Sequence, residues 1–495
     1  MAKLNIFMNV PEIPGKITRK IVGKGTYIYY DIEKVYLPER GYAIPKRVGI
    51  GVLNEDGSMT PNENFAKFLP EFLPDSKLRS KVSGCLRVGA FLVVRKIAED
   101  YGLFDKLGRE FNYESLMLFM DLVAYSLVSE DNAAQHYPDY AYNHPVFAEG
   151  MERYSDARVS DFFKSIVFEQ IAGFLSTWNK GRERKERIYI IYDSTNKNCQ
   201  AGDVSIAEFG HAKDDRGEPI FNYAIAFDQG NSEPLFYEEY SGSIVDVSQL
   251  QFMLSKAEGY GYKNVGFVLD RGYFSKANIR LMDEMHLPYV MVVKGMHSLV
   301  HDVVRKLRGK FELDSDSYVE AFDAYGRTVR RKLFCDDANE KYIHVYYSIG
   351  RAHSEQDKLR TLLNDARRFM ERQENTKVEF GQWYHRFFDI RYDRESGVFL
   401  YAREKKDVVK RELEMCGYFA VVTSEKMDAA KALKIYKGRD STEKLFRADK
   451  SFLGNRTMRV YSDESLSAKI FVEFVALIIR NKMHSCLKTA NLRNP

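Results

Sequence analysis

The chain has 495 residues, 45% of them hydrophobic and 29% charged, with a formal net charge of +4; these values are typical of a globular protein with about three domains. The sequence has no uncharged apolar run of about 18 residues, which argues against membrane spans, and prolines interrupt the N-terminal stretch, which argues against a signal peptide. The five cysteines are scattered without CxxC spacing, which argues against a zinc site and a disulfide framework. We therefore expect a cytoplasmic protein, and the fourteen Lys/Arg against six Asp/Glu in residues 431–495 indicate a polyanion partner.

The N-terminal part is predicted to contain two small modules. In residues 1–75, "TYIYY" and "VGIGVL" are β-rich and "NEDGS" is a turn signal, so we expect a small β module. Residues 76–186 instead carry long helical patterns such as "RVGAFLVVRKIAEDYGLF" and "SLMLFMDLVAYSLV". This second segment is predicted to be a helical module.

A series of well-defined strands and helices begins at residue 187. The runs "IYIIYD", "PIFNYAIAFD" and "PLFYEEYSG" predict three strands in a meander, and Asp246 can cap the helix that follows. The strand "VGFVLD", a helix capped by Ser275 and the strand "YVMVV" come next. This order predicts an α/β domain with a ribonuclease-H-like mixed sheet and helices on both faces. We assign it residues 187–295 and 425–485, interrupted by a largely β insertion over 296–424.

Two aspartates occupy matching places in this predicted sheet. Asp193 lies on or at the end of the first strand, and Asp270 ends the fourth. In the predicted strand order these strands are central neighbours, so the two side chains can converge. Either carboxylate alone is as readily explained by capping a turn or a helix. As a pair on adjacent strands, they favour a metal site.

The stretch "YKGRDSTEKLFRADK" carries four functional side chains on one predicted helix face. At 100° per residue, Tyr436, Arg439, Glu443 and Lys450 project within an arc of roughly 60°, along about 21 Å of helix. A solvated helix with an Arg–Glu pair is the alternative reading, and that pair would be worth only about 0.2–0.5 kcal/mol. The two aspartates favour the functional reading.

Glu443 is the candidate for a third carboxylate in the site. Asp440 is the nearest rival on this face, whereas Asp449 projects away from it. Three converging carboxylates repel one another unless a cation offsets their charge. Oxygen ligands favour Mg²⁺ or Mn²⁺, and two such ions about 3.5–4 Å apart can promote phosphoryl transfer. Arg439, Lys450 and Tyr436 would then grip DNA phosphates beside the scissile bond.

These residues resemble the Y-R-E-K signature of one branch of bacterial insertion-sequence DDE transposases, and the spacing matches in full. "YDSTN" and "LDRGYFS" resemble the two Asp motifs of that family, and "GHAKDDRG" resembles the segment after the first. The resemblance implies a ribonuclease-H-like catalytic domain with a β insertion and Mg²⁺-dependent cleavage. Together with the oxygen ligands, this leads us to expect two Mg²⁺ or Mn²⁺ ions per site. It also implies cleavage at terminal inverted repeats and strand transfer into target DNA, with excision through a hairpin. A homodimeric synaptic complex, a nucleoid-associated location, and reading of the transposon ends by the N-terminal modules are further implications.

Three further residues are weaker candidates for DNA contacts. Trp383 could stack on a base displaced in hairpin chemistry, although packing in the insertion is the more common role for such an aromatic residue. Lys294, just past the fifth strand, could reach a phosphate. Arg271 could contact DNA or pair with the adjacent Asp270.

Two alternatives to an active transposase remain at this stage. One is a ribonuclease-H-like nuclease that cuts DNA without joining it. The other is a domesticated, catalytically silent DNA-binding protein. The presence of all three acidic residues favours an active enzyme over the second alternative.

Overall fold

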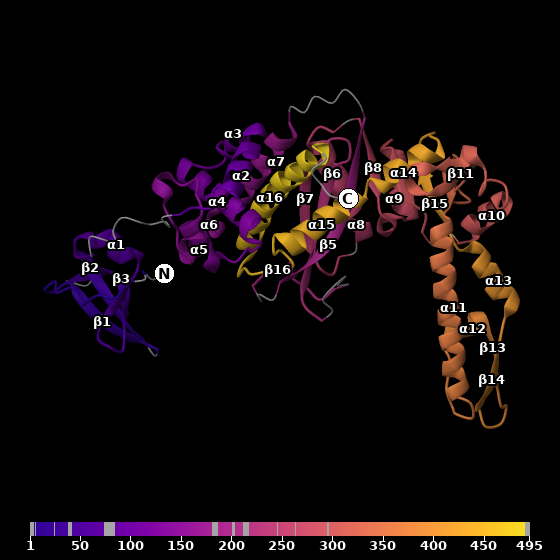
Figure 1. The fold of residues 1–495 in the computed structure, drawn as a ribbon, viewed down its shortest axis with the longest axis horizontal. Coiled ribbons are helices and arrows are strands. Elements are labelled where there is room, and N and C mark those ends of the chain that lie inside the picture. Colours follow the sequence, from indigo (N-terminus) through magenta and orange to yellow (C-terminus); the bar gives the residue numbers. More distant parts are fainter. Residues whose placement is uncertain are drawn as a thin grey trace.

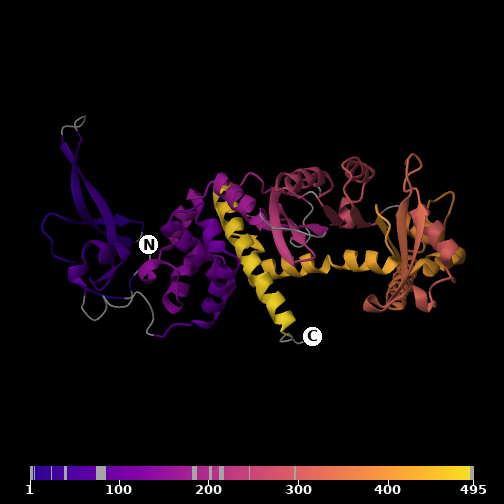
Figure 2. The same ribbon diagram turned by 90° about the horizontal axis from the view of Figure 1, so that it is seen from above.

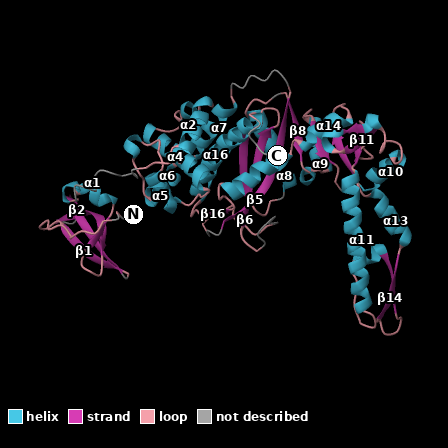
Figure 3. Cartoon of the chain, viewed as in Figure 1, coloured by secondary structure: helices cyan, strands magenta, loops and turns pink. Residues whose placement is uncertain are grey.

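The computed structural model describes residue 4 and residues 6–23, 25–37, 42–73, 85–180, 187–199, 203–210, 217–244, 246–262, 264–294 and 297–490. Figure 1 shows an elongated molecule in which an N-terminal β unit, a helical module, a central sheet and a projecting arm follow one another. Figure 3 separates these parts by secondary structure, with the strands concentrated in the N-terminal unit and the centre. Among the described residues, no helix is both long and apolar enough to cross a membrane.

The N-terminal unit is a four-stranded antiparallel sheet closed by one short helix. Asn62 caps that helix by accepting hydrogen bonds from the backbone N–H groups of Asn64 and Phe65. Ile28, Ile50 and Phe65 are fully buried in the separate core of this unit. Its elements are β1 (Ile17–Val22), β2 (Gly25–Leu37), β3 (Tyr42–Leu53), β4 (Met59–Pro61) and α1 (Glu63–Phe68).

The helical module packs against the long C-terminal helix α16 (Asp463–Thr489) and the edge of the central sheet. Every residue of α4 from 116 to 126 is buried, which explains its nearly continuous apolar sequence. The Trp178 indole donates a 2.9 Å hydrogen bond to the Pro234 carbonyl on the sheet. The principal helices of the module are α2 (Gly89–Asp100), α3 (Leu103–Leu107), α4 (Tyr113–Ser129), α5 (Tyr137–Asn143), α6 (Asp156–Ser165) and α7 (Phe168–Asn179).

The central sheet is mixed, which confirms the predicted α/β class. Strand β5 pairs antiparallel with β6 and parallel with β8, so the predicted adjacency of the first and fourth strands is confirmed. Helices cover both faces, because neighbouring β7 residues contact opposite layers: Phe236 contacts Tyr260 after α8, and Tyr237 contacts Phe474 of α16. The elements here are β5 (Ile188–Cys199), β6 (Ile220–Asp228), β7 (Glu233–Ser241), α8 (Asp246–Gly259), β8 (Val265–Leu269), α9 (Lys276–Glu284) and β9 (Tyr289–Val292).

The segment expected to be a largely β insertion has a different organisation. Its strands β10 (Tyr318–Val319), β11 (Ala324–Arg331), β12 (Lys341–Tyr347) and β15 (Tyr418–Thr423) extend the central sheet, because β15 pairs with β9. In the order β10-β11-β12-β15-β9-β8-β5-β6-β7, with β16 beside β5, the sheet has ten strands in the described part of the chain. The rest of the segment is mainly helical.

A long arm projects from this extension of the sheet in Figure 1, and Figure 2 views the same end of the molecule from above. The arm has a small core of its own, which includes Leu363, Met370, Phe380 and Phe399. Helix α10 precedes it on the sheet. The elements are α10 (His297–Leu307), α11 (Ile349–Arg372), α12 (Gln382–Phe387), β13 (Phe388–Tyr392), β14 (Phe399–Glu404) and α13 (Lys406–Met415).

The helix predicted across residues 436–450 is divided into three pieces. Helix α14 (Ala429–Lys437) ends at Gly438, α15 (Asp440–Arg447) follows, and a π-helical turn spans Ala448–Phe452. Gly438 and Arg439 keep right-handed helical backbone angles, so the chain changes little in direction between α14 and α15. The π-helical turn changes the rotation per residue, so the predicted helical phase does not extend to Lys450. Strand β16 (Thr457–Met458) and α16 complete the fold.

Candidate active site

The two predicted aspartates lie side by side on the central strands. Asp193 is inside β5, and Asp270 directly follows β8. The parallel register pairs Tyr192 with Leu269, so the next residue of each chain is an aspartate at the same level of the sheet. The buried apolar residues before them fix both strands in the core, and this places the two carboxylates at the end of β8.

Arg439 brings three carboxylates together. Its Nη1 lies 3.3 Å from Asp193 Oδ2 and 3.3 Å from Asp270 Oδ1. Its Nη2 donates a 2.6 Å hydrogen bond to Glu443 Oε1, one helical turn further along. The two aspartate oxygens are therefore no more than twice 3.3 Å apart. The structure therefore brings together the three acidic residues that the sequence singled out.

The exposure of the site increases from the sheet toward the helix. The side chains of Asp193 and Arg439 are 11% and 15% exposed, whereas those of Asp270 and Glu443 are 30% and 53% exposed. Asp193 and Arg439 therefore form the floor of the site, and Glu443 lies at its rim. Contacts with Asp193 are consequently less screened by water than those with Glu443.

Thr442 is a site residue that the sequence reasoning missed. Its buried hydroxyl donates to the Arg439 carbonyl at 2.8 Å and lies 3.4 Å from Asp193 Oδ2. Asp193 Oδ1 also accepts a 2.9 Å hydrogen bond from the Ser194 N–H. These contacts hold the Asp193 carboxylate in one orientation. The sequence did contain a pattern that could have identified Thr442: it lies three residues after Arg439, a spacing that places both on the same side of a helix.

Arg439 remains charged in this site. Burial alone would lower the pKa of its guanidinium, but Asp193 and Asp270 outweigh that effect and the pKa is raised. The Tyr436 ring lies beside it, with the guanidinium carbon 6.0 Å from the ring centroid. Burial raises the pKa of the Tyr436 phenol, so the phenol stays protonated and can donate a hydrogen bond near neutral pH.

A concavity of about 460 Å³ opens beside the carboxylates. Arg271, which is exposed, lines it together with Asp270, Tyr436 and Arg439. Arg351 lies there as well, with its guanidinium carbon 4.9 Å from the Phe419 ring centroid. The wall of this concavity is therefore rich in guanidinium groups and aromatic rings, which suits phosphates and bases.

The remaining candidate residues occupy other places. Lys450 is half-buried in the π-helical turn, and Lys294 is exposed in the loop after β9. Trp383 lies on α12 of the arm, where its ring packs against Tyr384 and Phe387. Asp449 points away from the carboxylates, as predicted, and pairs with a buried lysine. Most of "GHAKDDRG", at residues 210–217, lies outside the described residues.

The donor set of the site fits a hard divalent cation. Within the described ranges, no group of three or more His, Cys, Asp or Glu is already spaced as a metal site. Arg439 instead lies among Asp193, Asp270 and Glu443, and its contacts show that these three carboxylates converge on one cation. All available donors are oxygens, which suits Mg²⁺ or Mn²⁺. An ion could take this place once the Arg439 guanidinium withdraws.

The family model described as "Transposase DDE domain" matches residues 184–479, a range that includes Asp193, Asp270 and Glu443. The match covers more than half of the chain. No curated protein matches the chain.

Proposed function

The chain belongs to the transposase DDE domain family, and from this premise we propose that it is an active transposase of the Y-R-E-K branch. The family implies DNA as the substrate. In our proposal the enzyme cleaves at the terminal inverted repeats of an insertion sequence and joins the 3′-OH ends to target DNA. The observation that carries the proposal is the convergence of Asp193, Asp270 and Glu443 on Arg439.

In this proposal the three carboxylates hold two Mg²⁺ or Mn²⁺ ions. When bound, such ions activate the attacking hydroxyl and neutralise the leaving oxygen of a phosphodiester. Asp193 is held in orientation by the hydroxyl of Thr442 and the N–H of Ser194. Little further chemistry is required of the protein, because phosphoryl transfer depends mainly on positioning and charge neutralisation.

Arg439 has two successive partners in this proposal. In the protein alone it contacts the three carboxylates and offsets part of their negative charge, and with DNA bound it turns to a phosphate of the substrate. Its long side chain begins at the junction of α14 and α15, beside the concavity, so a rotation about its own bonds would suffice. Tyr436, Arg271 and Lys450 contact phosphates near the scissile bond. Lys294 is a further proposed phosphate contact.

Other parts of the proposal rest on the family resemblance. Excision would pass through a hairpin intermediate, and Trp383 would stack on a displaced base if the arm approaches the DNA end. The helical module would contact the transposon end, and two chains would form a synaptic dimer. The protein would act in the bacterial cytoplasm, at the nucleoid.

Cleavage of labelled end DNA by Asp193→Asn tests the proposal. Because the amide removes one of the proposed metal ligands, we expect cleavage to be lost while binding of the end DNA is largely retained. Asp440→Asn is the matched control, since Asp440 is exposed at the start of α15 and should leave cleavage intact. Normal cleavage by Asp193→Asn would show that the site is wrongly assigned.

The DNA products formed from labelled transposon ends distinguish the active transposase from the two alternative functions. An active transposase converts labelled ends into strand-transfer products with a target plasmid. A nuclease without strand transfer yields only cut ends, whereas a silent DNA-binding protein shifts the DNA and leaves it intact.

A further inference from the structure

A second charged cluster lies further along β5 from the candidate active site and is closed off from water. The Lys197 Nζ is 2.7 Å from Asp449 Oδ2 and 2.8 Å from Glu473 Oε2. The three side chains are 0–2% exposed. The ammonium also lies 4.5 Å from the centroid of the Tyr223 ring. We call Lys197, Asp449 and Glu473 the buried triad.

The buried triad joins three parts of the fold. Lys197 belongs to β5, Asp449 to the π-helical turn after α15, and Glu473 to α16. Burial alone would lower the pKa of Lys197, but Asp449 and Glu473 outweigh it and the pKa is raised, so the lysine stays charged. A charged lysine that pairs with two buried carboxylates therefore holds β5, the π-helical turn and α16 together at one place.

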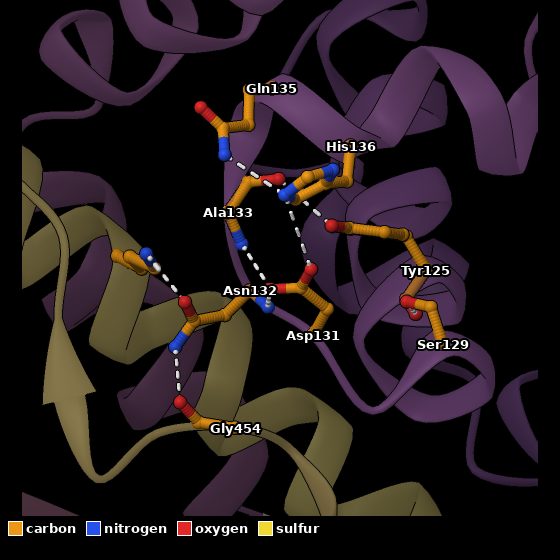
Figure 4. Close-up of polar contacts among 9 residues, drawn as sticks. Tyr125, Ser129, Asp131, Asn132, Ala133, Gln135, His136 and Gly454 are labelled. Carbon is orange, nitrogen blue, oxygen red and sulfur yellow. Dashed lines mark hydrogen bonds and ion pairs between the residues drawn. The ribbon is translucent and has the colours of Figure 1, made fainter.

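Polar contacts continue from the buried triad to the helical module. Asn455 Nδ2 donates to Asp449 Oδ1 at 2.8 Å, and Asn132 Nδ2 donates to Asn455 Oδ1 at 2.7 Å. Asn132, on the loop after α4, also donates to the Gly454 carbonyl at 3.0 Å, as Figure 4 shows. Lys469 Nζ donates to Asn132 Oδ1 at 3.2 Å. The module expected to hold the transposon end is thus linked to the segment that follows Glu443.

Strand β5 contacts α15 and the turn after it at two points. Asp193 and Lys197 are four residues apart, so they lie on the same face of the strand, about 13 Å from each other. Thr442 and Asp449 are seven residues apart, which is about 10 Å along a helix. Thr442 contacts Asp193 at one end and Asp449 contacts Lys197 at the other. Glu443 lies between these contacts, next to the first.

We propose that Lys197 is a positioning residue that fixes the rotation and height of α15 on β5, so that Glu443 faces Asp193 and Asp270. The proposal rests on the proposed function of these carboxylates. An apolar core of the same volume would stabilise the fold at least as well, since buried ion pairs add little net stability. A buried charge with two specific partners does distinguish one register from its neighbours, because a shifted helix would leave charges unpaired. Asn455 and Asn132 extend this control to the helical module.

Three variants of the full chain separate positioning from stability. Lys197→Met leaves Asp449 and Glu473 without their shared cation, and Asp449→Asn removes one of the two carboxylates. The double variant restores charge balance, because the charge of Lys469, which already acts on Glu473, then offsets this one remaining carboxylate. Lys341→Met is the matched control: Lys341 is also a poorly exposed sheet lysine, pairing at 2.6 Å with Asp283 of α9 rather than with α15.

Hydrogen exchange of the α15 amides is the first readout, and it needs neither metal nor DNA. We expect exchange in α15 to be at least tenfold faster in Lys197→Met and in the double variant, relative to amides of β8 in the same protein. Lys341→Met should leave this ratio unchanged. The double variant should melt at a higher temperature than Lys197→Met, but its α15 amides should exchange as fast as those of Lys197→Met.

Metal-dependent cleavage of end DNA is the second readout. We expect the double variant to cleave at least tenfold more slowly than the wild type at saturating Mn²⁺. Wild-type α15 exchange and wild-type cleavage in the double variant would overturn the proposal and leave Lys197 a stability residue only. If the wild-type chain itself does not cleave, the proposed function fails, while the exchange ratio still decides whether Lys197 holds α15.

Discussion

Replacing Arg439 by methionine removes the cation that contacts Asp193, Asp270 and Glu443, and keeps most of the apolar side chain. Because the guanidinium occupies the position proposed for a divalent ion, the two cations compete for the same oxygens. The variant should therefore bind Mn²⁺ more tightly in the absence of DNA. It should also be less stable without metal, since three carboxylates then face one another without a cation.

The size of this effect follows from the exposure of each contact. The pair with Glu443 is half exposed and contributes only a few tenths of a kcal/mol. The 3.3 Å contacts with Asp193 and Asp270 are more buried, and after desolvation each contributes about 1 kcal/mol. An ion that displaces Arg439 thus gives up about 2 kcal/mol, which corresponds to about a 30-fold weaker apparent affinity.

Calorimetric titration with Mn²⁺ measures this competition directly. We expect the dissociation constant of Arg439→Met to fall about 30-fold below that of the wild type. Arg351→Met is the matched control, because Arg351 lines the same concavity but pairs with Glu355 at 2.6 Å. Cleavage of end DNA by Arg439→Met should nevertheless be impaired, since the proposed phosphate contact is lost.

An unchanged or higher Mn²⁺ dissociation constant in Arg439→Met would refute the competition. A higher value would mean that the guanidinium gathers the carboxylates for the metal. Asp193→Asn shows whether the measured Mn²⁺ binds at this site or elsewhere. If it binds here, this substitution should abolish binding both in the wild type and in Arg439→Met.

Two further predictions concern buried polar groups of the sheet. Burial lowers the pKa of His344 to about 4, and its ring nitrogens lie 2.8 and 3.0 Å from the hydroxyls of Thr328 and Thr423. As pH falls from about 6.5 to 4, the unfolded chain binds a proton at His344 that the folded chain excludes, so the unfolding free energy should decrease by about 3 kcal/mol. In denaturant titrations, His344→Gln should flatten this pH dependence. An equally steep loss of stability in that variant would show that His344 is not its cause. The buried Tyr223 hydroxyl has no hydrogen-bond partner among the described residues, so Tyr223→Phe keeps the ring beside Lys197 and should leave the unfolding free energy within about 1 kcal/mol of wild type. A larger loss in chemical denaturation would show that the hydroxyl is satisfied.

The paired aspartates were predictable because two local patterns coincide. Each apolar run ends at or just before a carboxylate, and the strand order places the two runs next to each other. The buried residues of β5 and β8 leave few other ways to arrange them, since a one-residue slip would turn Asp193 to the opposite face. The helical face of the Y-R-E-K stretch likewise placed Arg439 and Glu443 together, one turn apart.

The partners of the later strands were not predictable from the same patterns. The runs that form β12 and β15 indicate strands, but alternation does not specify which sheet a strand joins. The pairing of β15 with β9 joins segments more than 100 residues apart and continues the central sheet. The break at Gly438 and the π-helical turn were also missed, because a helical face drawn at 100° per residue assumes one continuous regular helix, whereas α14 ends at Gly438 and Asp449 meets Lys197 from within a π-helical turn.

Two basic side chains neutralise carboxylates along one face of β5, and their different exposure gives them different roles. Arg439 pairs with Asp193 on the floor of a site that opens to solvent at Glu443, and in our proposal a divalent ion or a phosphate replaces one partner with another there. Lys197 pairs with Asp449 and Glu473 where nothing can enter, so its contacts cannot be exchanged without moving the helices. The same electrostatic pairing is therefore exchangeable at the reacting end of the strand and fixed at the other end. In our proposal the site releases Arg439 when it binds a divalent ion, and this fixed point keeps the carboxylates from separating by mutual repulsion when Arg439 leaves.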